Sequence, residues 1–153
     1  VWKTGDAGAT WQPVSDGLED AAIGAIAISS SNPQVLYAGS GHPEPRYDVQ
    51  SGNGLYRSTD GGQHWQHAGL RETRHIGAIL VDGKNPDIVL VGALGHWFGP
   101  NPERGVFRST DGGKSWKNTL FVDAQTGVVD LAVDPLAPEQ VYASSWTARN
   151  WPG

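Results

Sequence analysis

The stretch Leu-Tyr-Arg-Ser-Thr-Asp-Gly-Gly-Gln-His-Trp, residues 55–65, decides the fold because nearly the same letters occur twice more in the chain. Residues 1–11 read Val-Trp-Lys-Thr-Gly-Asp-Ala-Gly-Ala-Thr-Trp, and residues 106–116 read Val-Phe-Arg-Ser-Thr-Asp-Gly-Gly-Lys-Ser-Trp. The central aspartates of the three copies are 54 and 51 positions apart. Self-similarity at such a period is typical of solenoids and propellers.

Two further elements repeat in the same register. The first is an apolar run, and the second is another short apolar run that follows a turn containing proline. The apolar runs occupy residues 23–28, 76–81 and 128–133, and the runs after the turns occupy residues 35–39, 88–92 and 141–144. Both are short, rich in β-branched or aromatic residues, and bounded by turn residues, which predicts β-strands.

Each repeat therefore predicts four antiparallel strands, which is one propeller blade. In order, they are the apolar run, the run after the proline turn, the aromatic-basic run before the aspartate, and the segment after the tryptophan. The chain is predicted to be an all-β propeller segment of about three blades, two full and two half, within a larger or oligomeric ring. The expected boundaries are 1–20 for a half blade, 21–70 and 71–121 for full blades, and 122–153 for a half blade.

Composition excludes several classes of protein. The chain has 153 residues, 38% of them hydrophobic, so a packed core is possible. A net charge of −5 argues against non-specific nucleic-acid binding. No apolar run approaches the ~20 residues of a membrane span. Cysteine is absent, which excludes disulfides, thiolate zinc sites and thiol nucleophiles.

The repeated pattern Ser/Thr-x-Asp-x-Gly-x-x-Trp resembles the Asp-box, or BNR repeat, of sialidases, xyloglucan-degrading glycosidases and sortilin-type receptor ectodomains. Residues 92–108 look like the bacterial sortilin-like propellers that are often labelled glycosyl hydrolases. The resemblance implies a propeller that is secreted or attached to the cell envelope. It also implies either ligand binding or glycoside hydrolysis.

Each Asp-box is expected to stabilise the turn between the third and fourth strands. The carboxylate and hydroxyl would accept hydrogen bonds from turn amides, the glycine would adopt a positive φ, and the tryptophan would fold back over the hairpin. A calcium loop is not expected, because the alternating acidic ligands and the terminal glutamate are missing. The residues are Thr4, Asp6, Gly8 and Trp11 in box one, Ser58, Asp60, Gly62 and Trp65 in box two, and Ser109, Asp111, Gly113 and Trp116 in box three.

Antiparallel order predicts which connections share a face. The Asp-box turns and the proline turns lie on one face, called here the Asp-box face. The long, irregular connections lie on the opposite face, called here the loop face. Its loops between second and third strands are residues 41–53, 95–104 and 147–153, and those between blades are 16–22, 70–75 and 122–127. Irregular loops on a rigid scaffold are where function concentrates.

The loop-face candidates for ligand binding combine aromatic, cationic and carboxylate groups, which suits sugar stacking or peptide docking. They are His42, Glu44, Arg46, Tyr47, Asp48, Arg74, His75, His96, Trp97, Arg104, Asp130, Trp146, Arg149 and Trp151. Arg74 and His75 precede the innermost strand of a blade, so they could reach the ring axis or bond a loop carbonyl. Asp130 replaces an alanine of the other repeats and needs a partner. A metal site is not expected, since three separated histidines would have to converge.

Three functions remain open. The favoured one is a binding propeller for a peptide, protein or glycan, with no cofactor. The second is a glycoside hydrolase, which needs two carboxyl groups roughly 5 to 9.5 Å apart. The third is a structural assembly module. The carboxyl candidates are Glu44, Asp48, Glu103, Asp123 and Asp130, and their spacing selects no pair. The expected partners are further blades of a longer chain or a second copy of this one.

Overall fold

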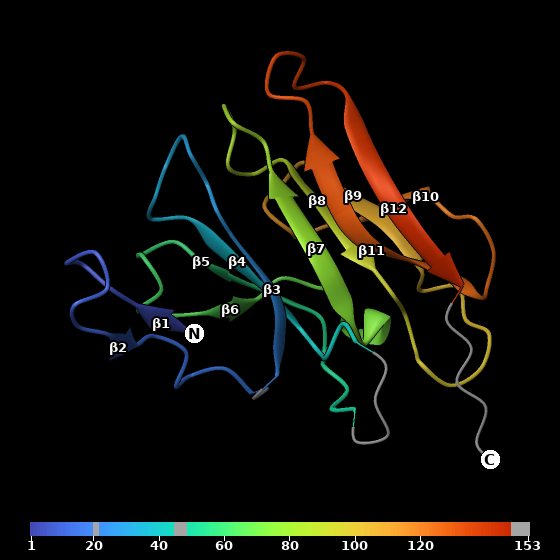
Figure 1. Ribbon diagram of the computed structural model, residues 1–153, viewed down its shortest axis with the longest axis horizontal. Helices are drawn as coiled ribbons and strands as arrows, with labels where there is room; N and C mark the ends of the chain where they lie inside the picture. The colour runs from blue at the N-terminus through green and yellow to red at the C-terminus, as the bar shows by residue number, and fades with distance from the viewer. Residues whose placement is uncertain (20–21, 45–48, 148–153) are drawn as a thin grey trace.

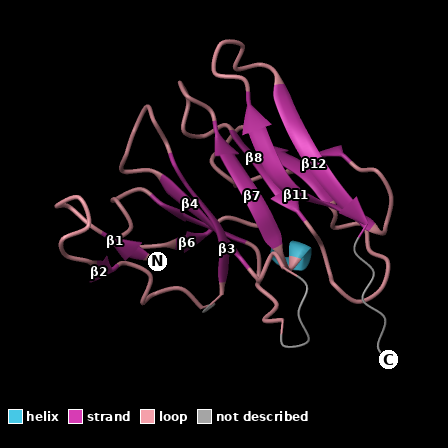
Figure 2. Cartoon of the chain, in the orientation of Figure 1, coloured by secondary structure: helices cyan, strands magenta, loops and turns pink. Residues whose placement is uncertain are grey.

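The computed structural model describes residues 1–19, 22–44 and 49–147. In these ranges the chain is all-β, with one 3-10 turn, η1 (Arg71–Thr73) (Figure 2). The strands are β1 (Trp2–Lys3), β2 (Gln12–Pro13), β3 (Ile23–Ile28), β4 (Leu36–Ser40), β5 (Leu55–Ser58), β6 (Gln66–His67), β7 (Ile76–Val81), β8 (Val89–Ala93), β9 (Gly105–Ser109), β10 (Lys117–Leu120), β11 (Thr126–Val133) and β12 (Val141–Thr147).

These strands form four antiparallel sheets in chain order: β1–β2, β3–β6, β7–β10 and β11–β12. Figure 1 shows β1–β2 at one end of the array and β11–β12 at the other, with the two four-stranded sheets between them. The prediction of an all-β propeller segment is confirmed. Within the described ranges, no helix has the length and apolar character needed to cross a membrane.

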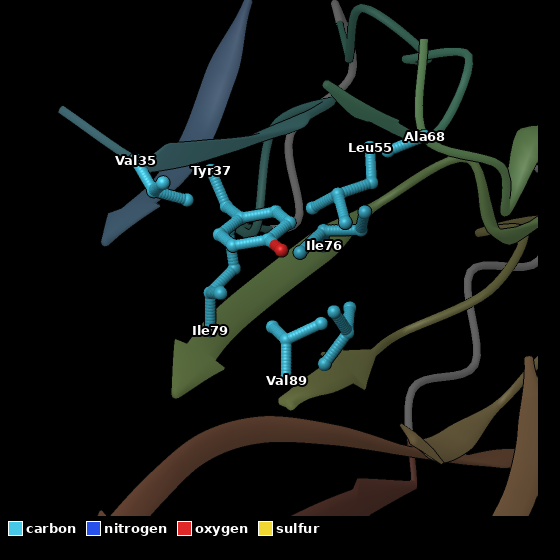
Figure 3. Packing of buried hydrophobic residues seen from close by; sticks show 8 residues of the cluster. Val35, Tyr37, Leu55, Ala68, Ile76, Ile79 and Val89 are labelled. Carbon is cyan, nitrogen blue, oxygen red and sulfur yellow. The ribbon is translucent and has the colours of Figure 1, made fainter. Parts of the chain in front are cut away.

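The blades pack face to face through apolar side chains. Tyr37 of β4 is completely buried and points at Ile79 and Val89 of the next blade (Figure 3). Its hydroxyl donates a hydrogen bond of 2.9 Å to the carbonyl of Pro86, in the turn of that blade. Beside it, the Arg57 guanidinium lies 2.5 Å from the Asp87 carboxylate. The seam between neighbouring blades therefore combines an apolar core with polar contacts at the Asp-box face.

The first strand of every blade has an irregular register near its start. The shift falls between Ile23 and Ala25 in β3, and at the corresponding places in β7 and β11. Gly24 and Gly77 occupy two of these positions. A Cβ on Gly24 would lie 2.4 Å from the carbonyl oxygen of Ile76, so the innermost strands approach at backbone distance.

The Asp-boxes have the predicted turn geometry. In box three, the Ser109 hydroxyl donates to Asp111 at 2.8 Å and accepts from the Gly113 amide at 2.9 Å. The Asp111 carboxylate also accepts from the Ser115 amide at 2.9 Å. Hydrogen bonds from the Ser115 side chain and backbone lower the pKa of Asp111 to about 2. Gly113 has the expected positive φ, 89°.

The tryptophans do more than cover their own hairpins. Trp116 donates its indole N–H to the carbonyl of Ala68 in the preceding blade, at 2.8 Å. Trp65 donates in the same way to the carbonyl of Val14, at 2.6 Å. Trp11 instead donates to Gly8 of its own turn. Boxes two and three therefore join neighbouring blades, which the hairpin interpretation did not predict.

We expect Ser109→Ala to lower the free energy of unfolding by about 1–3 kcal/mol, because it leaves the buried Gly113 amide without its acceptor. Asp111→Ala is expected to lower the thermal midpoint by a few degrees, since turn donors lose their acceptor. Neither change should alter ligand binding. Circular dichroism melts would measure both, with Asp16→Ala, an exposed aspartate outside the boxes, as the control. Unchanged melting of both box variants would contradict a structural role.

Candidate functional site

The loop face brings three connections together. The Gly52 amide donates to the carbonyl of Arg74 at 2.7 Å, which joins the loop after β4 to the segment before β7. The indole of Trp97, in the loop after β8, donates to the carbonyl of His42 at 3.4 Å. Loops from two blades and the connection between those blades therefore meet at one place.

A pocket of about 200 Å³ lies at this junction. Its lining residues are Val49, Ser51, Arg74, His75, His96, Trp97 and Phe98. Four of them, Arg74, His75, His96 and Trp97, are sequence candidates. The structure thus brings these four together, although their ligand-binding role stays a prediction.

His75 forms the inner wall of this pocket and is only 1% exposed. Burial lowers its pKa to about 4, against an opposing hydrogen bond to the His42 backbone. Its ring lies 5.5 Å from that of Trp97, and within the described residues its Nδ1 has no hydrogen-bond partner. His75 is therefore a neutral imidazole near pH 7.

Trp97 was expected to face solvent, and this expectation is wrong. Its side chain is 3% exposed and packs between His75 and Trp146. The ring centroids of Trp97 and Trp146 are 6.0 Å apart. The aromatic surface of the site belongs instead to Phe98, which is 59% exposed, and to Trp146, which is 41% exposed. Phe98 is not among the sequence candidates, because periodicity offers no signal for which residue of an irregular loop points outward.

Arg104 is likewise inaccessible, although it was a candidate for contact with a ligand. It is 1% exposed, and its guanidinium donates to the carbonyl of His96 at 2.5 Å. Asn101 supports the same loop by donating to the carbonyl of Gly99 at 3.2 Å. These two residues position the loop after β8, because they donate hydrogen bonds to the inward-facing carbonyl groups of this loop.

The outer wall of the pocket is polar. Arg74 has a positive φ of 58°, and its guanidinium lies 3.4 Å from the Glu72 carboxylate with 43% of the side chain exposed. The imidazole Nε2 of His96 lies 2.9 Å from the Glu72 carbonyl oxygen. The pocket therefore offers a cation, an imidazole and an exposed phenyl ring to one ligand.

The remaining candidates are scattered or lie outside the described residues. Asp130 is exposed, and its carboxylate accepts from the Leu131 amide at 2.8 Å, so its partner is local. Glu44 is exposed and His42 is half-buried at the edge of the loop. Within the described ranges, the histidines join no metal-ligand cluster. The candidates outside those ranges are Arg46, Tyr47, Asp48, Arg149 and Trp151.

The shifted pKa values of the described aspartates all change in one direction. A glycosidase acid needs a carboxyl group whose pKa is raised. Among the described aspartates, every shifted pKa is lowered, as for Asp123, where the Gln125 amide is the main cause. The site can hold a polar ligand with an apolar face, and none of these aspartates is tuned as an acid.

A larger cavity, about 470 Å³, lies on the Asp-box face between the second full blade and β11–β12. Leu90 lines it, along with Arg108 and Pro138. Leu90 occupies the register position that Tyr37 fills in the preceding blade, opposite an arginine in each case. The shorter side chain accounts for the gap, so this cavity reflects a change in the repeat.

Relatives of this chain include three xyloglucanases. One from Acetivibrio thermocellus is 27% identical over 124 residues, which cover 77% of this chain and 14% of the relative. One from Paenibacillus sp. is 29% identical over 164 residues, which cover 99% of this chain and 15% of the relative. One from Hypocrea jecorina is 30% identical over 136 residues, covering 79% and 15%. The chain therefore spans about one seventh of the length of these relatives.

Solved structures with a similar fold include an ancestral GH74 enzyme, with a TM-score of 0.57 and 23% identity over 83% of this chain and 17% of that one. The GH74 enzyme of Niastella koreensis has a TM-score of 0.50 and 20% identity, covering 71% and 15%. These similarities support the fold. Residues 1–135 match the family model described as Sortilin, neurotensin receptor 3. The chain belongs to the Sortilin-Vps10 family.

Proposed function

We propose that this chain is part of a propeller that binds a glycan on its loop face, in a protein of the glycoside hydrolase type. The observation that carries the proposal is the exposed Phe98 ring beside a pocket lined by Arg74 and His96. An exposed aromatic face with adjacent polar donors suits a sugar ring, which has apolar C–H faces and hydroxyl edges. The names of the xyloglucanase relatives favour xyloglucan as the glycan.

Binding is the role proposed for this segment, and hydrolysis is the second candidate. The relatives favour hydrolysis, and Glu44, Glu103, Asp123 and Asp130 supply carboxyl groups. The lowered pKa of Asp123 argues against that residue as the general acid, and the exposed Phe98 ring beside Arg74 and His96 favours binding. A polysaccharide ligand also agrees with a secreted or cell-envelope location, because such a polymer does not cross a membrane.

We expect the chain to bind xyloglucan oligosaccharides in calorimetric titration and to release no reducing ends from the polymer. Phe98→Ala should weaken binding at least tenfold, or about 1.4 kcal/mol, because the sugar loses its stacking surface. Leu136→Ala, which removes a 94% exposed side chain on the Asp-box face, is the control. Neurotensin tests the peptide alternative that the family description suggests.

The outcomes separate the candidates. Binding to neurotensin but not to xyloglucan would favour a peptide receptor and overturn the glycan proposal. Release of reducing ends would favour hydrolysis. Binding to neither probe would favour a structural assembly module. Equal affinity of the Phe98→Ala and unsubstituted chains for xyloglucan would place the site elsewhere.

A further inference from the structure

Arg74 lies at the centre of a strained turn in the wall of the loop-face pocket. Its φ is 58° and its ψ is −39°, a combination outside the left-handed helical region. The His75 amide donates a hydrogen bond of 2.5 Å to the carbonyl of Thr73, two residues earlier in the chain. The three residues therefore form a γ-turn with a positive central φ, which is the rare and strained form of this turn.

The repeat does not require this conformation between two blades. Apart from glycines, only Ala7, Leu70 and Arg74 have a positive φ among the described residues. Leu70 has a ψ of 35°, which is ordinary left-handed helical geometry. The corresponding connection before β11, residues 122–127, contains no positive φ. Strain at Arg74 is therefore a feature of this one connection.

The surrounding structure holds Arg74 in the strained conformation. The Gly52 amide donates to the carbonyl of Arg74 at 2.7 Å. A Cβ on Gly41 would lie 2.1 Å from the oxygen of the same carbonyl, so the loop after β4 packs directly on the turn. On either side of Arg74, Thr73 is 2% exposed and His75 is 1% exposed. The backbone of Arg74 is thus fixed by a neighbouring loop and by two buried side chains.

The side chain of Arg74, in contrast, is accessible to a ligand. It is 43% exposed and lines the pocket together with His96 and Phe98. Strained residues that persist because their surroundings fix them are concentrated at ligand-binding sites. A fixed backbone and the nearby Glu72 carboxylate also restrict the guanidinium before a ligand arrives, which reduces the entropy lost on binding.

Arg74 and Glu72 together offer complementary hydrogen-bonding groups. Their side chains approach to 3.4 Å, and 64% of the Glu72 side chain is exposed. A guanidinium only donates hydrogen bonds and a carboxylate only accepts them, whereas a hydroxyl does both. Two adjacent hydroxyls of a sugar can therefore accept from Arg74 and donate to Glu72. Since the two charges are opposite, the pair suits an uncharged sugar.

We propose that Arg74 is a ligand-contacting residue whose strained turn lowers the stability of the free chain, and that Arg74 and Glu72 bind two adjacent hydroxyls of a sugar stacked on Phe98. This inference rests on the proposed glycan-binding function. It predicts opposite effects at one position, because removing the strained side chain weakens the complex but relieves the fold. A residue with a purely structural role would not separate these two effects.

We expect Arg74→Ala and Arg74→Gly to weaken binding of xyloglucan oligosaccharides by about tenfold or more in calorimetric titration, because both lose the charged donor. In thermal melts without ligand, Arg74→Gly should unfold about 2–4 °C above Arg74→Ala, since glycine adopts a positive φ without the steric penalty. Arg71→Ala is the control for both measurements. It removes an exposed arginine of η1 that does not line the pocket.

Glu72→Ala tests the pair of hydroxyls. The variant should bind the same oligosaccharides about threefold or more weakly, because one hydroxyl loses its acceptor. Tighter binding by this variant would show that Glu72 competes with the ligand for Arg74, and it would overturn the assignment of adjacent hydroxyls.

The outcomes separate this inference from the proposed function. Xyloglucan binding that is weakened by Phe98→Ala but unchanged by Arg74→Ala would overturn the inference and leave the proposed function intact. Equal thermal midpoints of Arg74→Gly and Arg74→Ala would overturn the strained turn. An unsubstituted chain that binds no xyloglucan oligosaccharide would overturn both proposals.

Discussion

Trp116→Ala is expected to destabilise this protein strongly, by about 3–5 kcal/mol in the free energy of unfolding. The indole packs against the core at Ala68 and donates its N–H to the Ala68 carbonyl at 2.8 Å. A Cβ on Gly69 would lie 2.7 Å from the indole nitrogen, so the ring sits tightly on the preceding blade. Its loss opens a cavity in the seam and leaves a carbonyl unpaired.

Chemical denaturation of dilute protein would measure the effect. Trp116→Phe should cost less, about 1 kcal/mol for the lost hydrogen bond with some loss of packing. Trp11→Ala is the matched control, because this box has the same sequence pattern but docks on no other described blade. Similar losses for Trp116→Ala and Trp11→Ala would show that the tryptophan stabilises its own hairpin and not the seam.

The second large effect is an acid dependence set by His75. Burial lowers the pKa of His75 to about 4, whereas an unfolded histidine titrates near 6.5. Between these values the unfolded chain binds a proton that the folded chain does not. Stability therefore falls as the pH is lowered from about 6.5 to 4, by about 3 kcal/mol in total.

Urea unfolding at a series of pH values would show this slope. His75→Phe should flatten it between pH 6.5 and 4, because the buried ring then has no proton to gain. His64→Ser is the control. It gives box two the exposed serine that box three has at the same position, and it leaves the pocket unchanged. The Asp-box carboxylates change stability in a lower pH range than His75, because hydrogen bonds lower the pKa of Asp6 and Asp111 to about 2. A slope that survives His75→Phe would contradict the assignment.

The sequence predicted the blades because the apolar runs, the proline turns and the Asp-boxes all recur with the same period. The repeated turn residues predicted that the carboxylate and the hydroxyl of each box accept hydrogen bonds from turn amides, and the structure identifies which amides these are. Antiparallel order predicted that the loops near Arg74 and His96 would share a face. These features depend on local patterns, and a threefold repeat makes such patterns unambiguous.

What the sequence could not predict depends on packing between segments far apart in the chain. Trp97 and Arg104 lie in an irregular loop, where spacing does not show which side chain turns inward. The burial of Trp97 follows from its contacts with His75 and Trp146, which come from other parts of the chain. The hydrogen bond from the indole N–H of Trp65 to the carbonyl of Val14 likewise joins segments that are far apart in the chain. A single repeat does not contain the partner that its tryptophan needs.

The irregular start of each innermost strand has a consequence for the curvature of the ring. At two seams, Gly24 and Gly77 allow one backbone to lie directly against the next. A Cβ on Gly77 would lie 2.8 Å from the carbonyl oxygen of Val129. The radius of a propeller depends on how closely its innermost strands approach, because the blades widen outward from there. Two residues without side chains, next to the loop-face ends of β3 and β7, therefore set how tightly this arc bends.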